Sequence, residues 1–369
     1  MCNVLLTCAG RRNYLVEYFR KALAGRGEIF AADVSPYAPA LQEADRAFLV
    51  PPFNHEDYLP ALLGICREFG VRLLFSLSDL ELPALARVRG RFSEVGTLAV
   101  VSSPEVVDIC FDKLSTNRFL AGITIDTPKT WTTLAEAQAA MAAGDLKFPV
   151  AIKPRWGSAS IGNEYPENFE ELELASRLGR IRIMRSSLRA VSSGDEERCL
   201  LIQEKLAGEE YNLDVINDFQ GRYVTTLVKR KLAMRVGEGA VLAASVENPT
   251  LEALGRLIGE KLGHVGNLDC DVFVDGDRYC VIDLNPRFGG TYPFSHAAGA
   301  DLPAAFIAWA QGQPIDPRWL TLKPAIMTAK CDRVVEVVAE RALKPAPHPE
   351  QPESSVTQHR EEPLSGQVI

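Results

Sequence analysis

Short apolar segments alternate with longer amphipathic segments over the first hundred residues, and this alternation limits the fold more than any other feature. The apolar segments Asn3–Thr7 and Glu28–Ala32 flank an amphipathic stretch at Asn13–Ala24. Such an alternation is typical of strands joined by helices. Strands connected in this way form a parallel sheet with helices on both faces. We therefore predict a parallel α/β domain over residues 1–110.

The pattern changes beyond this domain. A helical segment at Leu134–Ala143 is followed by apolar, alternating segments at Val150–Lys153, Cys199–Lys205, Tyr211–Ile216 and Tyr223–Val228. Alternating segments joined by short turns indicate antiparallel strands. We therefore predict an α+β region with antiparallel pairing.

The composition excludes several classes of protein. The formal net charge is -8 and there is no tract of Lys and Arg, so we expect no nucleic-acid partner. No apolar run approaches the roughly 20 residues of a spanning helix, and the first ten residues do not resemble a secretory signal. We expect a cytoplasmic protein without a membrane partner. The last segment, 336–369, is rich in Pro, Glu, Ser and Gln and is predicted to be a flexible tail.

Two predicted strands near the C-terminal end carry the most informative polar residues. Asn267–Val274 and Arg278–Leu284 are separated by Asp275-Gly276-Asp277, a sequence favoured in tight hairpins. Asp283 and Asn285 are two residues apart and share one face, which Asp271 on the partner strand can also face. Two carboxylates and an amide oxygen suit Mg²⁺, which prefers hard oxygen ligands. The alternative is a solvated strand face, but the neighbouring residues are apolar, and buried carboxylates are rarely left unpaired.

Two further segments suggest binding of an anionic ligand. Arg287 follows Asn285 by two residues, where a guanidinium could stabilise charge on a transferring phosphoryl group or an oxyanion; an ordinary surface arginine is the alternative. Lys153 ends a predicted strand and precedes a loop whose amides could approach phosphate oxygens, although the loop lacks the ending of a Walker A motif and could be a simple connector. The small residues of that loop are Gly157, Ser158, Ser160 and Gly162.

Two other segments are more ambiguous. The strand with Gln203, Glu204, Lys205 and Leu206 runs through a Gly208 turn into another strand containing Glu210. Peptide groups at such a turn could pair with an adenine edge, and a carboxylate beyond it could accept ribose hydroxyls; a plain hairpin is the alternative. The tight basic cluster holds Lys229, Arg230, Lys231 and Arg235. It could neutralise phosphates or a substrate carboxylate, or it could be a solvated strand end.

The order of these motifs from Asn3 to about Ala329 resembles the ATP-grasp superfamily, especially its carbamoyl-phosphate-synthase-like and amino-acid-ligase branches. The resemblance implies a Rossmann-like pre-ATP-grasp domain at residues 1–110 and a two-lobed ATP-grasp domain at 111–335. The lid lobe would cover about 125–205 and the C-terminal lobe about 206–335. The implied cofactors are ATP and one or two Mg²⁺ ions, with Mn²⁺ as an alternative.

The resemblance also implies roles for individual residues. Lys113 and Lys153 would contact the phosphates, and the loop from Gly157 to Gly162 would close over them. Residues 203–206 would frame adenine, and Glu210 would hold the ribose. Asp271, Asp283 and Asn285 match the metal ligands, and Arg287 matches the catalytic arginine. Aspartate replaces the more usual glutamate at 271 and 283, so the shorter side chains alter the distance to a metal.

The predicted activity is that of an ADP-forming carboxylate–amine ligase, acting through an acyl phosphate on a small carboxylate such as an amino acid and on an amine. The alternatives are an ATP-binding protein without ligase activity, a carbamoyl-phosphate or carboxylation enzyme, and a nicotinamide oxidoreductase. The last is disfavoured because the glycine positions after Gly10 hold Arg12 and Leu15. The resemblance makes the first domain part of the substrate site, with Gly10, Arg11, Asp33 and Asp79 as candidates. A homodimer is also expected.

Overall fold

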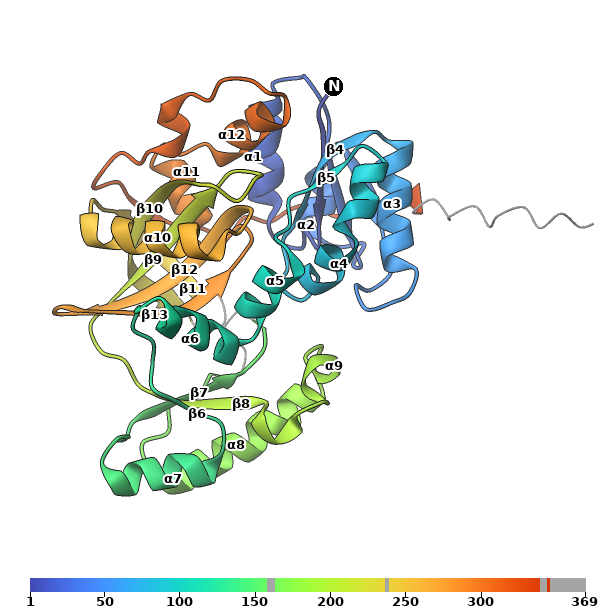
Figure 1. Cartoon of the computed structure of the whole chain (residues 1–369). Helices are drawn as coiled ribbons and strands as arrows, with labels where there is room; N and C mark the ends of the chain where they lie inside the picture. The colour runs from blue at the N-terminus through green and yellow to red at the C-terminus, as the bar shows by residue number, and fades with distance from the viewer. Residues whose placement is uncertain (158–162, 236–238, 339–343, 346–369) are drawn as a thin grey trace, which may run out of the picture.

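The computed structural model describes residues 1–157, 163–235, 239–338 and 344–345. Three sheets organise the chain, and Figure 1 shows one of them, with its helices, standing apart from the other two. This mixed architecture of one parallel and two antiparallel sheets confirms the fold class predicted from the sequence. No helix within the described ranges is both long and apolar enough to cross a membrane.

The N-terminal domain is a parallel sheet covered by helices. Its strands are ordered β15-β3-β2-β1-β4-β5. In chain order the elements are β1 (Asn3–Thr7), α1 (Asn13–Leu23), β2 (Ile29–Asp33), α2 (Pro39–Glu43), β3 (Arg46–Leu49), α3 (Tyr58–Glu68), β4 (Val71–Ser76), α4 (Leu82–Glu94) and β5 (Leu98–Ala99). The edge strand β15 (Lys344–Pro345) comes from the C-terminal end of the chain. The strand order reverses at β1, and ligands of open α/β sheets bind at the carboxyl ends of strands at such a point.

Two helices, α5 (Pro104–Phe111) and α6 (Lys113–Gly122), connect the N-terminal domain to a small lobe built on a three-stranded antiparallel sheet. We call this part the lid lobe. It contains β6 (Thr130–Trp131), α7 (Leu134–Ala143), β7 (Val150–Pro154), α8 (Phe169–Met184), α9 (Arg189–Ser192), η1 (Glu196–Arg198) and β8 (Leu200–Glu204). Helix α7 begins with a capping box, because Thr133 and Glu136 bond each other's backbone amides.

The C-terminal lobe is built on a six-stranded sheet ordered β13-β12-β9-β10-β11-β14. Its elements are β9 (Glu209–Asn217), β10 (Tyr223–Arg235), β11 (Gly239–Ser245), α10 (Pro249–Leu262), β12 (Gly266–Asp275), β13 (Arg278–Asn285), α11 (Tyr292–Ala297), α12 (Leu302–Ala310), η2 (Pro317–Leu320) and β14 (Met327–Ala329). One face of this sheet is apolar and packs on α5, α6 and α10. The opposite face carries polar side chains and forms the floor of the candidate site.

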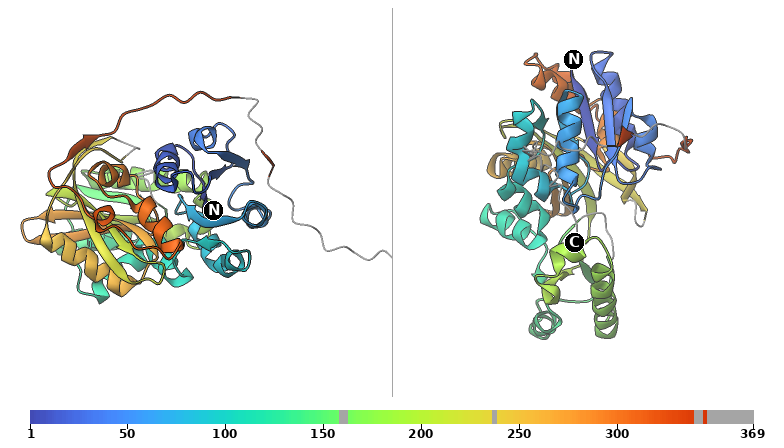
Figure 2. Two further views of the ribbon diagram at one scale, coloured as in Figure 1. Left: turned by 90° about the horizontal axis from the view of Figure 1, so that it is seen from above. Right: turned by 90° about the vertical axis from the view of Figure 1, so that its right-hand side faces the viewer.

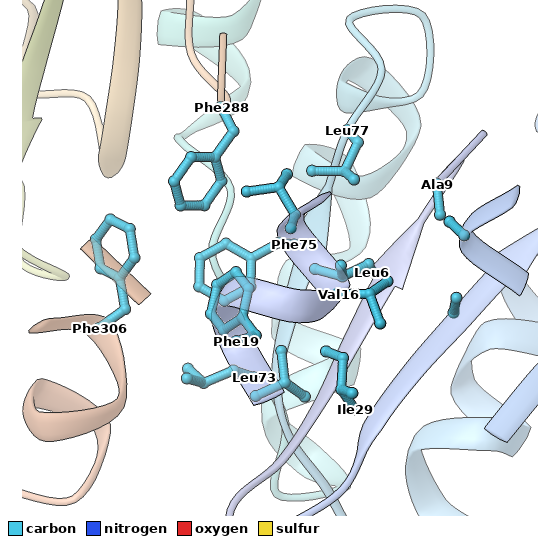
Figure 3. Close-up of a cluster of buried hydrophobic side chains, with 14 of the residues drawn as sticks. Leu6, Ala9, Val16, Phe19, Ile29, Leu73, Phe75, Leu77, Phe288 and Phe306 are labelled. Atoms are coloured by element: carbon cyan, nitrogen blue, oxygen red, sulfur yellow. The ribbon is translucent and has the colours of Figure 1, made fainter. Parts of the chain in front are cut away.

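A shared core joins the N-terminal domain to the C-terminal lobe. Phe288 and Phe306 of the C-terminal lobe pack against Phe75 of β4, and Phe288 also contacts Phe19 of α1 (Figure 3). Figure 2 shows α12 beside α1 in the view from above, in agreement with their contacts. Because these aromatic rings are buried in one cluster, the two parts have a fixed relative position.

Candidate nucleotide and metal site

A pocket of about 310 Å³ lies between the lid lobe and the polar face of the six-stranded sheet. Lys153 and Trp156 line it from the lid lobe, whereas Asp271 and Asp283 line it from the sheet. It also reaches the N-terminal domain at Arg12. All three parts of the chain therefore contribute to one pocket.

The hairpin β12–β13 brings the predicted metal-binding residues together. Asp271 is the direct cross-strand partner of Asp283, and Asn285 is the partner of Asp269. Directly paired residues point to the same face of an antiparallel sheet. The structure thus places Asp271, Asp283 and Asn285 in one pocket, where they remain candidate metal ligands.

Cations lie beside these carboxylates. The Lys231 ammonium is 2.7 Å from Asp271 Oδ1 and 2.5 Å from Glu210 Oε1. Burial opposes the charge on Lys231, but Asp271 and Glu210 outweigh it and raise the pKa of this lysine. The Lys113 ammonium is 3.8 Å from Asp283 Oδ1 and donates a hydrogen bond to the Gly157 carbonyl.

The two predicted phosphate-binding lysines come from different elements. Lys113 is the first residue of α6, whose N-cap Asp112 also accepts two hydrogen bonds from Arg155 at 2.8 and 2.7 Å. Lys153 stands near the end of β7, and its ammonium is 3.4 Å from the Ile282 carbonyl oxygen. Burial, with repulsion from Lys113, lowers the pKa of Lys153 to about 8. Two cations close together in a partly enclosed pocket suit an anion carrying several charges.

Arg287 is buried at the inner end of the same pocket, where the C-terminal lobe meets the N-terminal domain. Its Nε and Nη2 donate to Asp79 Oδ2 at 3.0 and 2.7 Å, and its Nη1 donates to Asp269 Oδ2 at 2.9 Å. Burial disfavours its charge, but Asp79 and Asp269 raise the pKa of Arg287. Asp79, predicted as a substrate residue, therefore contacts the predicted catalytic arginine directly.

The structure places other predicted residues away from the pocket lining. Gln203 is buried in the lid sheet and donates to Thr130 Oγ1 at 2.7 Å, and the Glu204 carboxylate pairs with Arg278 at 2.7 Å. Lys205 lies over the Tyr165 ring. Leu206 is half-buried and Arg235 forms an exposed pair with Asp332. Neither residue lines the pocket.

The first-domain candidates also differ in position. Arg11 is exposed, whereas its neighbour Arg12 lines the pocket. The Gly10 amide donates to Asp33 Oδ2 at 2.8 Å, so both residues shape the loop that carries Arg12. The predicted phosphate-loop residues Ser158, Ser160 and Gly162 lie outside the described residues, as does most of the predicted tail 336–369.

Of the two alternatives for the basic cluster, a solvated strand end does not describe Lys229 and Lys231. Strand β10 continues to Arg235, so Lys229 and Lys231 lie within it and point to the polar face. Lys229 is fully buried, where it pairs with Asp214 and donates to Ser295 Oγ at 2.9 Å. Pairing with β9 and β11 extends the strand, and both lysines on its polar face have acidic partners.

The pocket residues suit a divalent cation in their chemistry. Asp271, Asp283 and Asn285 supply hard oxygen atoms, the ligand type that Mg²⁺ prefers. Within the described residues, no cluster of three His, Cys, Asp or Glu side chains is arranged to hold a metal ion. The set of two carboxylates and one amide is therefore suited to an ion whose remaining ligands are phosphate oxygens and water.

Two protein families match the chain. The family described as "PylC-like, N-terminal domain" matches residues 4–101, and the family described as "ATP-grasp in the biosynthetic pathway with Ter operon" matches residues 196–331. The second match contains the whole β12–β13 hairpin and Arg287. The similarity to an ATP-grasp family therefore covers the region that carries the candidate site.

Solved ATP-grasp structures share the fold. An L-amino acid ligase from Bacillus licheniformis is 17% identical and has a TM-score of 0.68, covering 89% of this chain and 79% of that one. A biotin carboxylase from Campylobacter jejuni is 16% identical and has a TM-score of 0.66, covering 86% of this chain and 73% of that one.

A carbamoyl phosphate synthase large chain from Rubrobacter xylanophilus is 25% identical over 248 residues, which is 65% of this chain. The match spans 21% of that relative, so it corresponds to about a fifth of the relative's length.

Sequence reasoning missed three residues that line the pocket. Asn212 donates to Asp269 Oδ1 at 2.7 Å and to Asp271 Oδ1 at 2.8 Å, which fixes both carboxylates. Asp269 precedes Asp271 by two residues on a predicted strand. Because residues two apart in a strand point to the same face, the sequence could have predicted Asp269 as a site residue. Arg12 lines the pocket and donates to the Phe288 carbonyl oxygen, and no local sequence pattern predicts a contact between residues 276 positions apart.

Proposed function

We propose that the chain is an ATP- and Mg²⁺-dependent, ADP-forming carboxylate–amine ligase that acts through an acyl phosphate. The observation that carries the proposal is the convergence of Asp271, Asp283 and Asn285 with Lys113 and Lys153 in one pocket between two lobes. Paired carboxylates next to paired lysines suit a metal-bound triphosphate, because each charge then has a partner of opposite sign.

Within this proposal, each part of the pocket has a task. Asp271, Asp283 and Asn285 hold Mg²⁺, which offsets phosphate charge when bound. Lys113 and Lys153 bind phosphate oxygens, and the loop Gly157–Gly162 excludes water from the acyl phosphate. The segment 203–206, whose side chains do not line the pocket, frames adenine with its peptide groups, and Glu210 lies beside the ribose.

The proposed reaction has two steps. A substrate carboxylate oxygen attacks the γ-phosphorus, the bond to the β–γ bridging oxygen breaks, and ADP leaves. An amine then attacks the acyl carbon, loses a proton and releases phosphate, forming an amide. Arg287 stabilises the charge on the acyl phosphate and on the tetrahedral oxyanion. The carboxylate is that of an amino acid or a similar small acid.

A screen of phosphate release tests the proposal. Wild-type protein is mixed with Mg-ATP and pairs of amino acids, and products are identified by mass spectrometry. We expect phosphate release that requires both members of a pair, and a mass equal to the two amino acids minus water. An Asp283→Asn variant should fold with its apolar core unchanged but should release no phosphate. Nucleotide binding without any substrate-dependent turnover would favour an ATP-binding protein without ligase activity.

A second candidate is carbamoyl-phosphate or carboxylation chemistry, in which bicarbonate is the carboxylate. It is favoured by the similarity over 65% of the chain to a carbamoyl phosphate synthase large chain. The same assay with bicarbonate alone separates the two candidates. Bicarbonate-stimulated ADP formation without any amino acid supports the second candidate.

A further inference from the structure

Two guanidinium groups meet at the inner end of the pocket, which we define by Arg12, Arg287, Asp269 and Thr291. Arg12 Nη1 donates to the Phe288 carbonyl oxygen at 2.7 Å, and Arg287 Nη1 donates to the same oxygen at 3.2 Å. Two like charges that share one acceptor repel each other, and in a partly buried place this repulsion is weakly screened.

The two arginines differ in how their charges are balanced. Arg287 donates to the carboxylates of both Asp79 and Asp269. Arg12 forms no ion pair within 4.0 Å among the residues that the structure describes, and its side chain donates only to the Phe288 carbonyl there. Burial in particular, together with the nearby Arg287, lowers the pKa of Arg12. A guanidinium in this position has unused N–H donors on the pocket wall.

The Arg12 guanidinium is held rigidly. Asp33 accepts hydrogen bonds from the amides of Gly10 at 2.8 Å and Ser35 at 2.9 Å, which fixes the loop before α1. Phe288, whose carbonyl orients Arg12, is buried in the aromatic cluster shared by the two parts of the molecule (Figure 3). A binding group that is already ordered loses little entropy when a ligand arrives.

The charge count at the inner end favours a single negative charge. The net charge of the two arginines and two aspartates there is zero (Arg12, Arg287, Asp79 and Asp269). A monocarboxylate would add one negative charge, whereas a phosphate dianion would add two beside the two aspartates. The cross-strand pair Asp269–Asn285 lies two residues along the strands from the pair Asp271–Asp283, a distance of roughly 7 Å. A carboxylate at Arg12 is therefore beside the Asn285 end of the candidate metal ligands and one step along the strands from the Asp271–Asp283 pair.

We propose that Arg12 of the N-terminal domain binds the carboxylate of the acid substrate and holds it at the inner end of the pocket. This inference rests on the proposed ligase function and names the residue that selects its acid substrate. Arg12 would bind the ground-state carboxylate, whereas Arg287, already neutralised by two aspartates, would serve the charge that develops later. The substrate class is a small monocarboxylate rather than a phosphorylated acid.

A pair of adjacent variants tests this inference. Arg12→Met removes the charge and keeps an unbranched side chain, and Arg11→Met makes the same change at the exposed neighbour. Each protein is saturated with the Mg²⁺ complex of a non-hydrolysable ATP analogue and titrated with acetate, glycine, alanine and glutamate by calorimetry. We expect the wild type to bind at least one acid, Arg12→Met to bind it at least about 10-fold more weakly, and Arg11→Met to bind it as the wild type does.

Several outcomes would overturn the inference: no acid bound by the wild type, equal affinity in Arg12→Met, or an equal loss in Arg11→Met. Nucleotide affinity is measured in the same samples. If the wild type does not bind nucleotide, this result counts against the proposed function and not against an Arg12-dependent carboxylate site. If Arg12→Met does not fold, Arg12→Lys keeps the charge but loses the two-pronged geometry, and it should still weaken acid binding. Wild-type acid affinity in a folded Arg12→Lys would also contradict the inference. In turnover assays the effect should fall on KM for the acid, with kcat little changed.

Discussion

At the scale of single residues, acidic and basic side chains are matched across the polar face of the six-stranded sheet. Lys229 pairs with Asp214, Lys231 with Glu210 and Asp271, and Arg287 with Asp79 and Asp269. Such buried pairs are costly to break, because the remaining partner keeps its charge in a poorly solvated place. Stability and activity are therefore linked at this face.

Arg287→Met tests this link. The change leaves the buried carboxylates of Asp79 and Asp269 without their shared cation, so we expect the free energy of unfolding to fall by about 3 kcal/mol or more. The measurement is urea-induced unfolding. Adding Asp79→Asn to the same chain removes one of the stranded charges and should recover part of the loss. A single variant as stable as the wild type would show that this arginine contributes no net stability.

A buried histidine gives a prediction for pH. His264 is fully buried, its Nε2–H donates to the Val215 carbonyl at 2.9 Å, and burial lowers its pKa to about 4. The folded pKa lies below the ordinary value of 6.5, so the unfolded chain binds a proton first as the pH falls. This contribution to stability is complete above pH 6.5 and is lost towards pH 4, by up to about 3 kcal/mol.

The corresponding measurement is the free energy of unfolding at several pH values between 4.5 and 7.5, for the wild type and for His264→Gln. The variant should lose stability at pH 7.5 but show a flatter pH dependence below 6.5. Parallel curves for the two proteins would mean that another group accounts for the acid sensitivity.

At the scale of elements, the connection between the lid lobe and the C-terminal lobe depends on a close backbone approach. Gly208 lies between β8 and β9 with φ of +93°, and a Cβ atom there would be 2.2 Å from the Val274 carbonyl oxygen of β12. Only glycine fits such a conformation and such a contact. The turn therefore fixes where the lid lobe leaves the sheet.

Gly208→Ala should lower the free energy of unfolding by about 1–3 kcal/mol and weaken nucleotide binding, because the strand must move. Gly90→Ala is the matched control, since Gly90 is exposed in α4 with open space around its Cβ position. That control should stabilise the protein by about 0.5–1 kcal/mol. Thermal unfolding and nucleotide titration of both variants check this, and equal behaviour of the two would contradict the steric argument.

Local sequence patterns were sufficient to predict the secondary-structure elements, but they were less sufficient to predict which residues form the site. The turn sequence 275–277 predicted the β12–β13 hairpin. The period of two placed Asp271, Asp283 and Asn285 on one face, because a strand fixes side-chain direction. The predicted strand ended at Val228, whereas β10 continues to Arg235 and its lysines pair with acidic residues of β9. Arg12 could not be predicted as a pocket residue, because its partner Phe288 lies in a different part of the chain.

At the scale of the whole molecule, the N-terminal domain and the C-terminal lobe share a core. Phe288 is almost fully buried among rings of both parts, including Phe19, Phe75 and Phe306. Residues in one close-packed cluster stabilise each other, so these two parts should unfold together. The lid lobe has its own apolar cluster, which includes Ile152 and Leu172, and can respond separately.

Phe288→Ala tests the shared core. Removing this ring should lower the free energy of unfolding by about 3–5 kcal/mol. It should also weaken acid binding, because the ring anchors the backbone whose carbonyl oxygen orients Arg12. Tyr37→Ala is the control, since Tyr37 is exposed. Calorimetric unfolding is the measurement, and an unchanged main transition in Phe288→Ala would contradict the shared core.

The central claim is that a carboxylate is activated by direct phosphorylation. The most direct measurement uses the acid found in the screen, labelled with ¹⁸O in its carboxylate, together with Mg-ATP and the amine. Mass spectrometry of the released phosphate should find one ¹⁸O atom per molecule, because the attacking carboxylate oxygen leaves with the phosphoryl group. Unlabelled phosphate, with amide formed in equal amount, would contradict the acyl-phosphate account.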